Sequence, residues 1–534
     1  MLSFIKAKAQ APRARKATLG VHELGERIVP AGLIDVTFQN GTLNIVGDAN
    51  ANTLTVNQTA DGRLTLSTDI GTAMKVNGAN VVGFMGATLA SPVTGAVTVN
   101  MGDGFDSLTF SGATEDIDLP GALTINNGDG NNLLTFMQGV TVSGNTTITN
   151  GADLDTIHLN DETNFLGKLT INNGAGGSLL DANAMADLRV GGVFAVTSGA
   201  GFDKLTVEAA KSVTLGGFTL KTGADADGSD TDLSPTDALT VNGKVTVTNG
   251  AGDDLLDIGD PTLVTKITGA VAINNGAGAN HTDLVGADTL SVGGPISVTG
   301  GANDDLVHLG INSGNVSFGA VTVTAGAGNN GVIVAGVTLN VLGNLTVTGG
   351  AGADTVQVLA TNDAMITGAV NVTAGAGQNT VEMHADSGHT LTLGKTLTFT
   401  STSAAANTNS VYLRDIKALG ATAVTTGAGN DTISIDDAAF NGTVTLKTGD
   451  GKDTVNIEQQ AILTGHTMFN KAVVIQTGAG DDTVKLSGVL AEPERKAIFN
   501  ASAKFDGGAG ADTLALSDFG ANLFYGPAPV KVSF

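Results

Sequence analysis

The sequence predicts an all-β fold: a right-handed single-stranded parallel β-helix with about 25 residues and three short strands per coil, capped at both ends. Two observations carry this prediction. Paired glycine turns recur along more than four hundred residues, and apolar residues alternate with polar ones on both sides of each turn. Because neither a 3.6-residue period nor long helix-forming runs occur, helical and leucine-rich repeats are excluded.

The glycine repeat has two parts that lie seven residues apart. The first part is a single glycine that recurs every 22 to 27 residues, at Gly95, Gly121, Gly144, Gly167, Gly192, Gly216, Gly243, Gly269, Gly294, Gly319, Gly343, Gly368, Gly394, Gly420 and Gly442. The second part is a turn such as Gly350-Ala351-Gly352, whose first glycine we call the anchor. We expect glycine at these corners because a sharp bend needs a positive φ and because a side chain would strike its copy in the next coil.

The alternation on either side of the anchor predicts the strands. Before anchor Gly350, the apolar residues are Leu345 and Val347; after it they are Val356 and Val358. A third, shorter run precedes the single glycine. A period of two, rich in β-branched residues, is typical of strands with one face inward. Stacked amides and hydroxyls just before the anchors, as at residues 126–127 and 149–150, predict a structural hydrogen-bond ladder.

Composition favours one elongated domain and excludes several partners. The 534 residues contain 75 Gly but only 10 Pro, and 41% are hydrophobic, so a core is available. The net charge of −25 repels nucleic acid and anionic membranes. No segment is predicted to be a transmembrane helix, since the best candidate, residues 76–101, is broken by Pro92 and several polar residues. The absence of cysteine excludes disulfides and thiolate metal sites.

The chain divides into four parts. Residues 1–31 form a basic leader without a signal-peptide core, residues 32–94 form an N-terminal β cap, residues 95–516 form the array, and residues 517–534 form a C-terminal cap. In the cap, Ala60-Asp61-Gly62 predicts a hairpin turn. Aromatic residues of the tail, Phe519, Phe524, Tyr525 and Phe534, are expected to cover the last coil, and the charged insert at residues 491–496 is expected to bulge out.

The leader carries a resemblance that bears on location. Residues 21–31, Val-His-Glu-Leu-Gly-Glu-Arg-Ile-Val-Pro-Ala, are similar to the Leu-Glu-x-Arg tag of large exported surface proteins of planctomycete bacteria, although a glycine separates Leu24 from Glu26. The alternative is an arbitrary disordered leader. The resemblance implies a secreted or cell-surface protein.

The most chemically suggestive residues lie four positions after each anchor. They are Asp106, Asn132, Asp155, Ser178, Asp203, Asp227, Asp254, Asn280, Asp305, Asn330, Asp354, Asn379, Asp431, Asp453, Asp482 and Asp512. Residues 506–514, Asp-Gly-Gly-Ala-Gly-Ala-Asp-Thr-Leu, resemble the Gly-Gly-x-Gly-x-Asp repeat of haemolysin-type calcium-binding proteins, which implies Ca²⁺ between coils. That family stacks the motif in tandem every nine residues, whereas here it occurs once per coil.

Two interpretations of this column stay open. In one, each oxygen caps the backbone N–H groups of its own turn. In the other, calcium binds in the C-terminal run, where no Asn separates the aspartates and neighbouring charges would repel by about 3 to 4 kcal/mol at an effective dielectric of 20. The candidate metal ligands are Asp431, Asp453, Asp481, Asp482, Asp506 and Asp512. Calcium is the one cofactor that the sequence suggests.

Catalysis is the least favoured of the function classes. Polysaccharide lyases and hydrolases on β-helices use long loops, clustered acids with Arg or Lys, and aromatic platforms, whereas here connections are short and aromatic residues are 4% of the chain. The seven histidines, His158 and His308 among them, are expected to be ordinary surface residues. No catalytic motif is found.

The function we expect is a non-enzymatic, exported structural or adhesive solenoid that presents Thr, Asn and Asp ladders. Residues 306–353 carry no Lys, Arg, Asp or Glu, so a neutral surface lies in mid-rod. Uncharged flat β surfaces associate readily, which favours lateral self-association or contact with surface glycans or proteins. A calcium-stabilised module is the first alternative and a polysaccharide-active enzyme the second.

Overall fold

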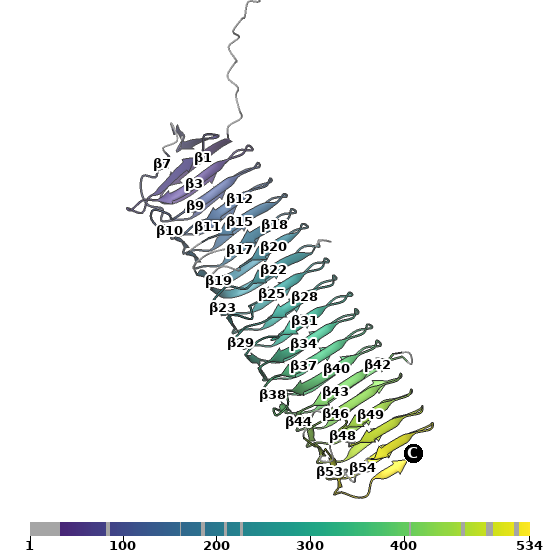
Figure 1. Ribbon diagram of the computed structural model, residues 1–534. Coiled ribbons are helices and arrows are strands. Elements are labelled where there is room, and N and C mark those ends of the chain that lie inside the picture. The colour runs from purple at the N-terminus through teal and green to yellow at the C-terminus, as the bar shows by residue number, and fades with distance from the viewer. Residues whose placement is uncertain are drawn as a thin grey trace, which may run out of the picture.

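The computed structural model describes residues 32–81, 86–160, 162–182, 187–207, 211–224, 228–404, 407–460, 465–487, 495–516 and 523–534. These residues form a parallel β-solenoid of about 16 turns with about 25 residues per turn, and they contain no helix. The stacked coils make a straight rod (Figure 1). This confirms the predicted fold class. The expected leader, residues 1–31, lies outside the described residues.

Each coil contributes one strand to each of three columns. The first column precedes the anchor turn, and its strands pair in parallel with their copies one coil on, as Thr322 and Val323 pair with Thr346 and Val347. It contains β2 (Thr42–Val46), β8 (Val97–Asn100), β11 (Leu123–Asn126), β14 (Thr146–Thr149), β17 (Leu169–Asn172), the second half of β19 (Leu188–Thr197) and of β21 (Ser212–Lys221), β24 (Val245–Thr248), β27 (Val271–Asn274), β30 (Ile296–Thr299), β33 (Val321–Thr324), β36 (Leu345–Thr348), β39 (Val370–Ala374), β42 (Leu397–Ser403), β45 (Thr422–Gly427), β48 (Val444–Lys447), β51 (Val473–Gln476), β54 (Ala503–Asp506) and β57 (Val530–Val532).

The second column follows the anchor turn and forms a separate sheet. Its strands are β3 (Thr53–Gln58), β9 (Ser107–Ser111), β12 (Leu133–Phe136), β15 (Asp155–Leu159), β18 (Ser178–Asp181), β20 (Asp203–Thr206), β22 (Ser229–Leu233), β25 (Leu255–Ile258), β28 (His281–Leu284), β31 (Leu306–Leu309), β34 (Gly331–Gly336), β37 (Thr355–Ala360), β40 (Thr380–Ala385), β43 (Ser410–Arg414), β46 (Thr432–Asp436), β49 (Thr454–Ile457), β52 (Thr483–Leu486) and β55 (Thr513–Leu516).

The third column precedes the single glycine of the repeat. It contains β10 (Ile117–Leu119), β13 (Val140–Val142), β16 (Thr163–Phe165), the first half of β19 and of β21, β23 (Ala238–Val241), β26 (Val264–Ile267), β29 (Thr289–Val292), β32 (Asn315–Phe318), β35 (Thr338–Val341), β38 (Ala364–Ile366), β41 (Leu391–Leu393), β44 (Ile416–Ala418), β47 (Ala439–Phe440), β50 (Thr467–Phe469), β53 (Ala497–Phe499) and β56 (Leu523–Phe524). Because β19 and β21 run through the corner, the first and third columns join into one sheet.

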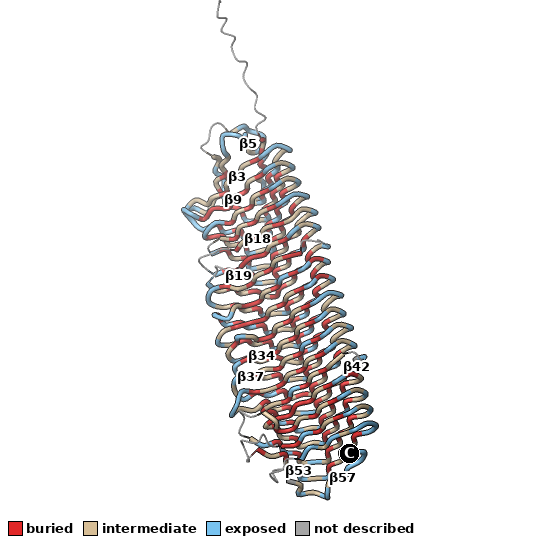
Figure 2. The backbone as a smooth tube through the Cα atoms, turned by 45° about the vertical axis from the view of Figure 1, so that its right-hand side comes forward, coloured by how far each residue is buried: buried red, intermediate tan, exposed pale blue. Residues whose placement is uncertain are grey.

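The core is the line of inward-facing apolar side chains that runs the length of the rod. Alternate residues of the strands are buried, which appears as regular red segments along the tube (Figure 2). In the third column, Phe440, Phe469, Phe499 and Phe524 stack face to face with ring centroids 4.8 to 5.2 Å apart. Offset aromatic stacks of this kind add to the hydrophobic gain of burial. The described residues contain no helix long and apolar enough to cross a bilayer.

The segment 32–94 contains antiparallel pairs as well as parallel ones. β1 (Gly32–Gln39) pairs with β2, β3 with β4 (Leu64–Thr68), β4 with β7 (Ala87–Thr88), and β5 (Thr72–Val76) with β6 (Ala79–Asn80). The β3–β4 pair confirms the hairpin predicted at Ala60-Asp61-Gly62. β2 and β3 also pair in parallel with β8 and β9, so the first and second columns begin inside this segment.

At the C-terminal end, two expectations need correction. Phe524 does continue the internal aromatic stack, but Tyr525 and Phe534 are 71% and 38% exposed. Phe519 lies outside the described residues. The insert does not simply bulge out, because Arg495, at its end, is only 2% exposed and contacts the buried Glu458 at 2.8 Å. Residues 491–494 lie outside the described residues.

The expectation that the corner glycines need a positive φ holds only for some anchors: Gly151, Gly174 and Gly350 and all the single glycines of the repeat lack one, and there only the close contact with the preceding coil excludes a side chain. At other anchors both reasons apply. Gly449 has a φ of 90°, and a methyl group there would also overlap the carbonyl oxygen of Gly427 in the preceding coil. Gly388 has the same φ of 90° but no atom near the place of a Cβ. We expect Gly388→Ala to cost about 1 kcal/mol through φ alone, and Gly449→Ala to cost about 2 kcal/mol more through the overlap. Urea unfolding of both variants measures this; equal losses would show that the overlap is relieved without cost.

Candidate functional site

The column of Asp and Asn residues predicted from the anchors exists and is buried. Each member directly precedes or begins a strand of the second column, and its side chain lies under the anchor turn. The members are Asn52, Asp106, Asn132, Asp155, Ser178, Asp203, Ser229, Asp254, Asn280, Asp305, Asn330, Asp354, Asn379, Asn409, Asp431, Asp453, Asp482 and Asp512; all except Asp512 are less than 9% exposed.

Three members differ from the prediction. Ser229, not Asp227, stands opposite Asp203, and Asp227 itself lies outside the described residues. Asn409 fills the coil in which Ser401 replaced the anchor, and Asn52 begins the column. The anchor count missed these residues because the turns of those coils differ in length. These residues could have been found from the sequence by another signal, the alternation typical of strands that starts directly after each of them.

The first oxygen of each side chain continues the hydrogen-bond ladder of the sheet. The backbone N–H of Asp431 donates to Oδ1 of Asp453 at 2.7 Å, and the N–H of Asp453 donates to Oδ1 of Asp482 at 2.8 Å. Asp482 donates in the same way to Asp512 at 3.0 Å. The sequence-based expectation that these oxygens cap their own turn is therefore incomplete: Oδ1 accepts from the preceding coil. The amide ladder predicted just before the anchors is also present, with Asn127 donating to Asn150 at 2.7 Å.

Asparagine satisfies the rest of its turn. The amide nitrogen of Asn132 donates to the carbonyl oxygens of Gly128 and Gly130, at 3.2 and 2.9 Å, where both glycines have positive φ. Asn330 and Asn379 contact the equivalent carbonyls of their own turns. The amide nitrogen therefore faces two backbone oxygens in each of these turns, although only Gly326 of the Asn330 turn and neither glycine of the Asn379 turn has a positive φ.

Aspartate occurs in two kinds of turn. At Asp305 and Asp354, Oδ2 accepts the N–H of the anchor glycine, at 2.9 and 3.1 Å, so both oxygens are satisfied. At Asp431, Asp453, Asp482 and Asp512, Oδ2 is buried and has no hydrogen-bond partner in the described part of the chain. The hydroxyls of Thr448 and Thr477 lie near Asp453 and Asp482, but they donate to the carbonyls of Thr477 and Gly507. The turns of these four coils all have positive φ at both glycines, from 84° to 149°, as in the turn of Asn132. Asp106 has the same arrangement.

Burial of these carboxyl groups shifts their titration. Burial raises the pKa of Asp453 to about 6, although the hydroxyl of Thr448 and the N–H of Asp431 act against the shift; the neighbouring charges of Asp431 and Asp482 add to it. Burial also raises the pKa of Asp482 and brings that of Asp106 to about 7. A buried carboxylate oxygen that has no hydrogen-bond donor is stabilised by a proton or by a cation.

The two other candidate ligands lie outside this column. Asp481 is exposed in the anchor turn, where its Oδ1 accepts the N–H of Ala511 at 2.9 Å. Asp506 ends β54 and pairs with the ammonium group of Lys504 at 2.9 Å. The structure therefore brings together Asp431, Asp453, Asp482 and Asp512, and gives Asp481 and Asp506 other partners.

The donor set of the C-terminal turns fits calcium. Each turn has one uncompensated carboxylate oxygen beside two glycine carbonyls, of which those of Gly449 and Gly478 already accept the N–H of Ala479 and Ala509. Carboxylate and carbonyl oxygens are the ligand types that Ca²⁺ takes. The site requires no thiolate or imidazole, which matches the preference of hard cations for oxygen.

The outer surface of the described residues carries several depressions. One of about 370 Å³ is lined by Asp116, Glu162, Asp187 and Lys211 on the third column, and it contains the residue types that the enzyme alternative requires. Comparison of the chain with protein-family models, with curated proteins and with solved structures found no match. The resemblances to calcium-binding repeats and to an export tag therefore rest on their sequence motifs alone.

Proposed function

We propose that the chain is a non-enzymatic structural rod, exported to the cell surface or beyond, that associates laterally through a neutral face of the first column. The observation that carries this proposal is the in-register stacking of that column, which repeats uncharged outward residues, mostly threonine, over most of the rod's length. The exported location rests on the resemblance of residues 21–31, which lie outside the described residues.

The neutral face is the row of outward residues at the centre of the first column. Successive pairings align Asn44, Thr98, Thr124, Thr147, Thr170, Ala195, Thr219, Thr246, Ala272, Ser297, Thr322, Thr346, Asn371, Thr398, Ala423 and Thr445. None is charged. The uncharged stretch at residues 306–353 contributes Thr322 and Thr346 to this longer row. The other outward row of the same strands contains the exposed Lys221 and Lys447, so only this row is uncharged. A β surface lacks the features that keep sheets apart where charges are absent.

Two lysines in this row are expected to abolish lateral association. Thr322 and Thr346 are adjacent outward residues, so Thr322→Lys with Thr346→Lys places two like charges about 4.8 Å apart on the contact face. Light scattering and sedimentation of the full chain measure the association. The control is Thr355→Lys with Thr380→Lys, an equally adjacent outward pair on the second column. If the first variant associates as the natural chain does, the neutral face is not the contact.

A second proposal concerns calcium, because a specific observation favours it. The orphaned oxygens of Asp431, Asp453, Asp482 and Asp512 would hold Ca²⁺ together with the carbonyls of their glycine turns. The bound cation would neutralise charges that repel one another and would tie successive coils together. The rod would then be stiff and stable in calcium-rich surroundings. The calcium dependence of unfolding tests this proposal.

A further inference from the structure

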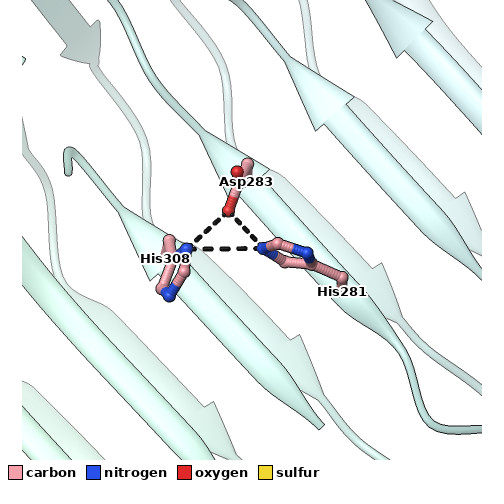
Figure 3. Close-up of side chains that lie close together, drawn as sticks. All are labelled: His281, Asp283 and His308. Carbon is pink, nitrogen blue, oxygen red and sulfur yellow. Dashed lines mark hydrogen bonds and ion pairs between the residues drawn. The ribbon is translucent and has the colours of Figure 1, made fainter. Parts of the chain in front are cut away.

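Two histidines and an aspartate converge on the outer face of the second column, on strands that begin directly after Asn280 and Asp305 of the aspartate column. His281 and Asp283 lie on β28, and His308 lies on the next strand, β31 (Figure 3). The side chains are 39%, 25% and 14% exposed, respectively. The expectation that His308 is an ordinary surface histidine is therefore wrong, since it is largely covered and contacts Asp283.

The three ligand atoms have the spacing of a metal site. Nε2 of His281 and Nδ1 of His308 lie 2.9 and 2.8 Å from the same oxygen, Oδ1 of Asp283, and 3.4 Å from each other. Atoms bound at about 2.1 Å to one tetrahedral Zn²⁺ are about 3.4 Å apart. The distance between the two nitrogens matches this value, and the two distances to Oδ1 are shorter. The triangle is thus close to the size that a zinc ion requires, with one nitrogen from each of two rings already turned towards a common point (Figure 3).

The surroundings favour a cation. In the parallel register, Asp232, Asp257, Asp283 and His308 form one outward row over four successive coils. Asp232, Asp257 and Asp283 also line a depression of about 160 Å³ beside the histidines. Stacked carboxylates along one row raise the local concentration of cations, and the depression leaves room for water or an external ligand.

We propose that His281, Asp283 and His308 form a binding site for a divalent transition metal of the zinc class, with one coordination position open towards the depression. Two imidazoles and one carboxylate are a common protein ligand set for a zinc ion that keeps an open position. His281 and Asp283 come from one coil and His308 from the next, so the bound ion fastens two coils together on the outside of the rod. The open position accepts water, or a carboxylate or imidazole from a partner.

Calorimetric titration of the full chain with Zn²⁺, in the presence of millimolar Ca²⁺, tests the proposal. We expect one zinc ion per chain, and we expect Co²⁺ in its place to give the visible absorption of a four-coordinate site. His281→Ala and His308→Ala should each weaken binding by more than about 100-fold, since even loss of a residue that only orients a ligand costs 10 to 100-fold.

Two control variants separate this site from others. His158 lies 3.7 Å from Asp181 on the same outer face, and the structure places no third metal ligand with them among the described residues. His158→Ala should leave zinc binding unchanged, and Asp453→Asn should do the same if the ion avoids the aspartate column. Circular dichroism confirms that each variant is folded. Failure of the natural chain to bind Zn²⁺ at about micromolar to millimolar concentration, or equal binding by the His281→Ala His308→Ala double variant, would overturn the proposal.

Discussion

Millimolar calcium is expected to raise the free energy of unfolding by about 3 to 4 kcal/mol for each site that it occupies at 100 to 1,000 times its dissociation constant, and EDTA is expected to remove the gain. The reason is the set of buried, unpartnered oxygens of Asp431, Asp453, Asp482 and Asp512. Thermal unfolding followed by circular dichroism, with and without the cation, measures the effect. An unchanged midpoint would contradict calcium binding.

Substitution of one aspartate sharpens this test. In EDTA at pH 7.5, Asp453→Asn should stabilise the chain by about 1 to 3 kcal/mol, because an amide nitrogen would donate where a carboxylate oxygen now lacks a partner. The same change should reduce the calcium response. The control is Asp354→Asn, where Oδ2 accepts the N–H of Gly350. The free energy of unfolding of that variant should fall by about 1 kcal/mol, and calcium should still stabilise it as much as it stabilises the natural chain. The opposite pattern would show that the C-terminal turns are merely capped.

The calcium gain should also depend on pH. The pKa of Asp453 is raised by burial to about 6, from an ordinary value of 3.8, so the folded state holds this proton more tightly than the unfolded state. Without calcium, this tighter proton binding adds to the free energy of unfolding. The added stability is complete below about pH 4 and is lost as pH rises through about 6. Calcium binds the ionised carboxylate, so the stability that calcium adds appears above about pH 6. Unfolding midpoints between pH 4.5 and 7.5 should therefore fall in EDTA and recover in calcium; Asp453→Asn should flatten the first trend.

Removal of Arg495 is expected to destabilise the chain by about 3 to 5 kcal/mol at pH 8, because it leaves buried carboxylates without their cation. The guanidinium lies 2.8 Å from Glu458 and 3.5 Å from Asp436, both almost fully buried. Burial raises the pKa of Glu458 to about 7. Glu458 therefore binds its proton more tightly in the folded state than in the unfolded state. The stability that this proton adds is lost as pH rises through about 7.

Urea unfolding of Arg495→Met at two pH values measures this effect. We expect a smaller loss at pH 5 than at pH 8, since protonation of Glu458 removes a charge that the missing guanidinium would have balanced. The matched control is Arg189→Met, an exposed arginine on β19, which should change stability by less than about 0.5 kcal/mol. A loss at Arg495 that is small and independent of pH would mean that the buried carboxyls are neutral without it.

The sequence alone determined the architecture because the contacts of a parallel solenoid are copies of one another. Each residue of a strand pairs with its equivalent one coil on, as Val323 pairs with Val347, so a repeated local pattern is also the tertiary pattern. The turn glycines, the alternating core residues and the buried aspartate column could all be located for that reason. Where a turn differs in length, as before Ser229 and Asn409, the count from the anchor no longer gives the register.

Only the tertiary structure decided which of these aspartates lack a partner. Residues 350–354 and 508–512 have the same sequence, Gly-Ala-Gly-Ala-Asp, yet Oδ2 of Asp354 accepts a backbone N–H and Oδ2 of Asp512 has no partner in the described chain. Gly508 and Gly510 have φ values of 84° and 149°, and they follow coils with nearly the same values. The N–H of Gly480 donates to Ala509 at 2.8 Å, as Gly451 donates to Ala479 at 2.7 Å. Hydrogen bonds between successive turns thus impose the conformation of one turn on the next. The five residues of a turn cannot specify that conformation by themselves, because it depends on the neighbouring coil.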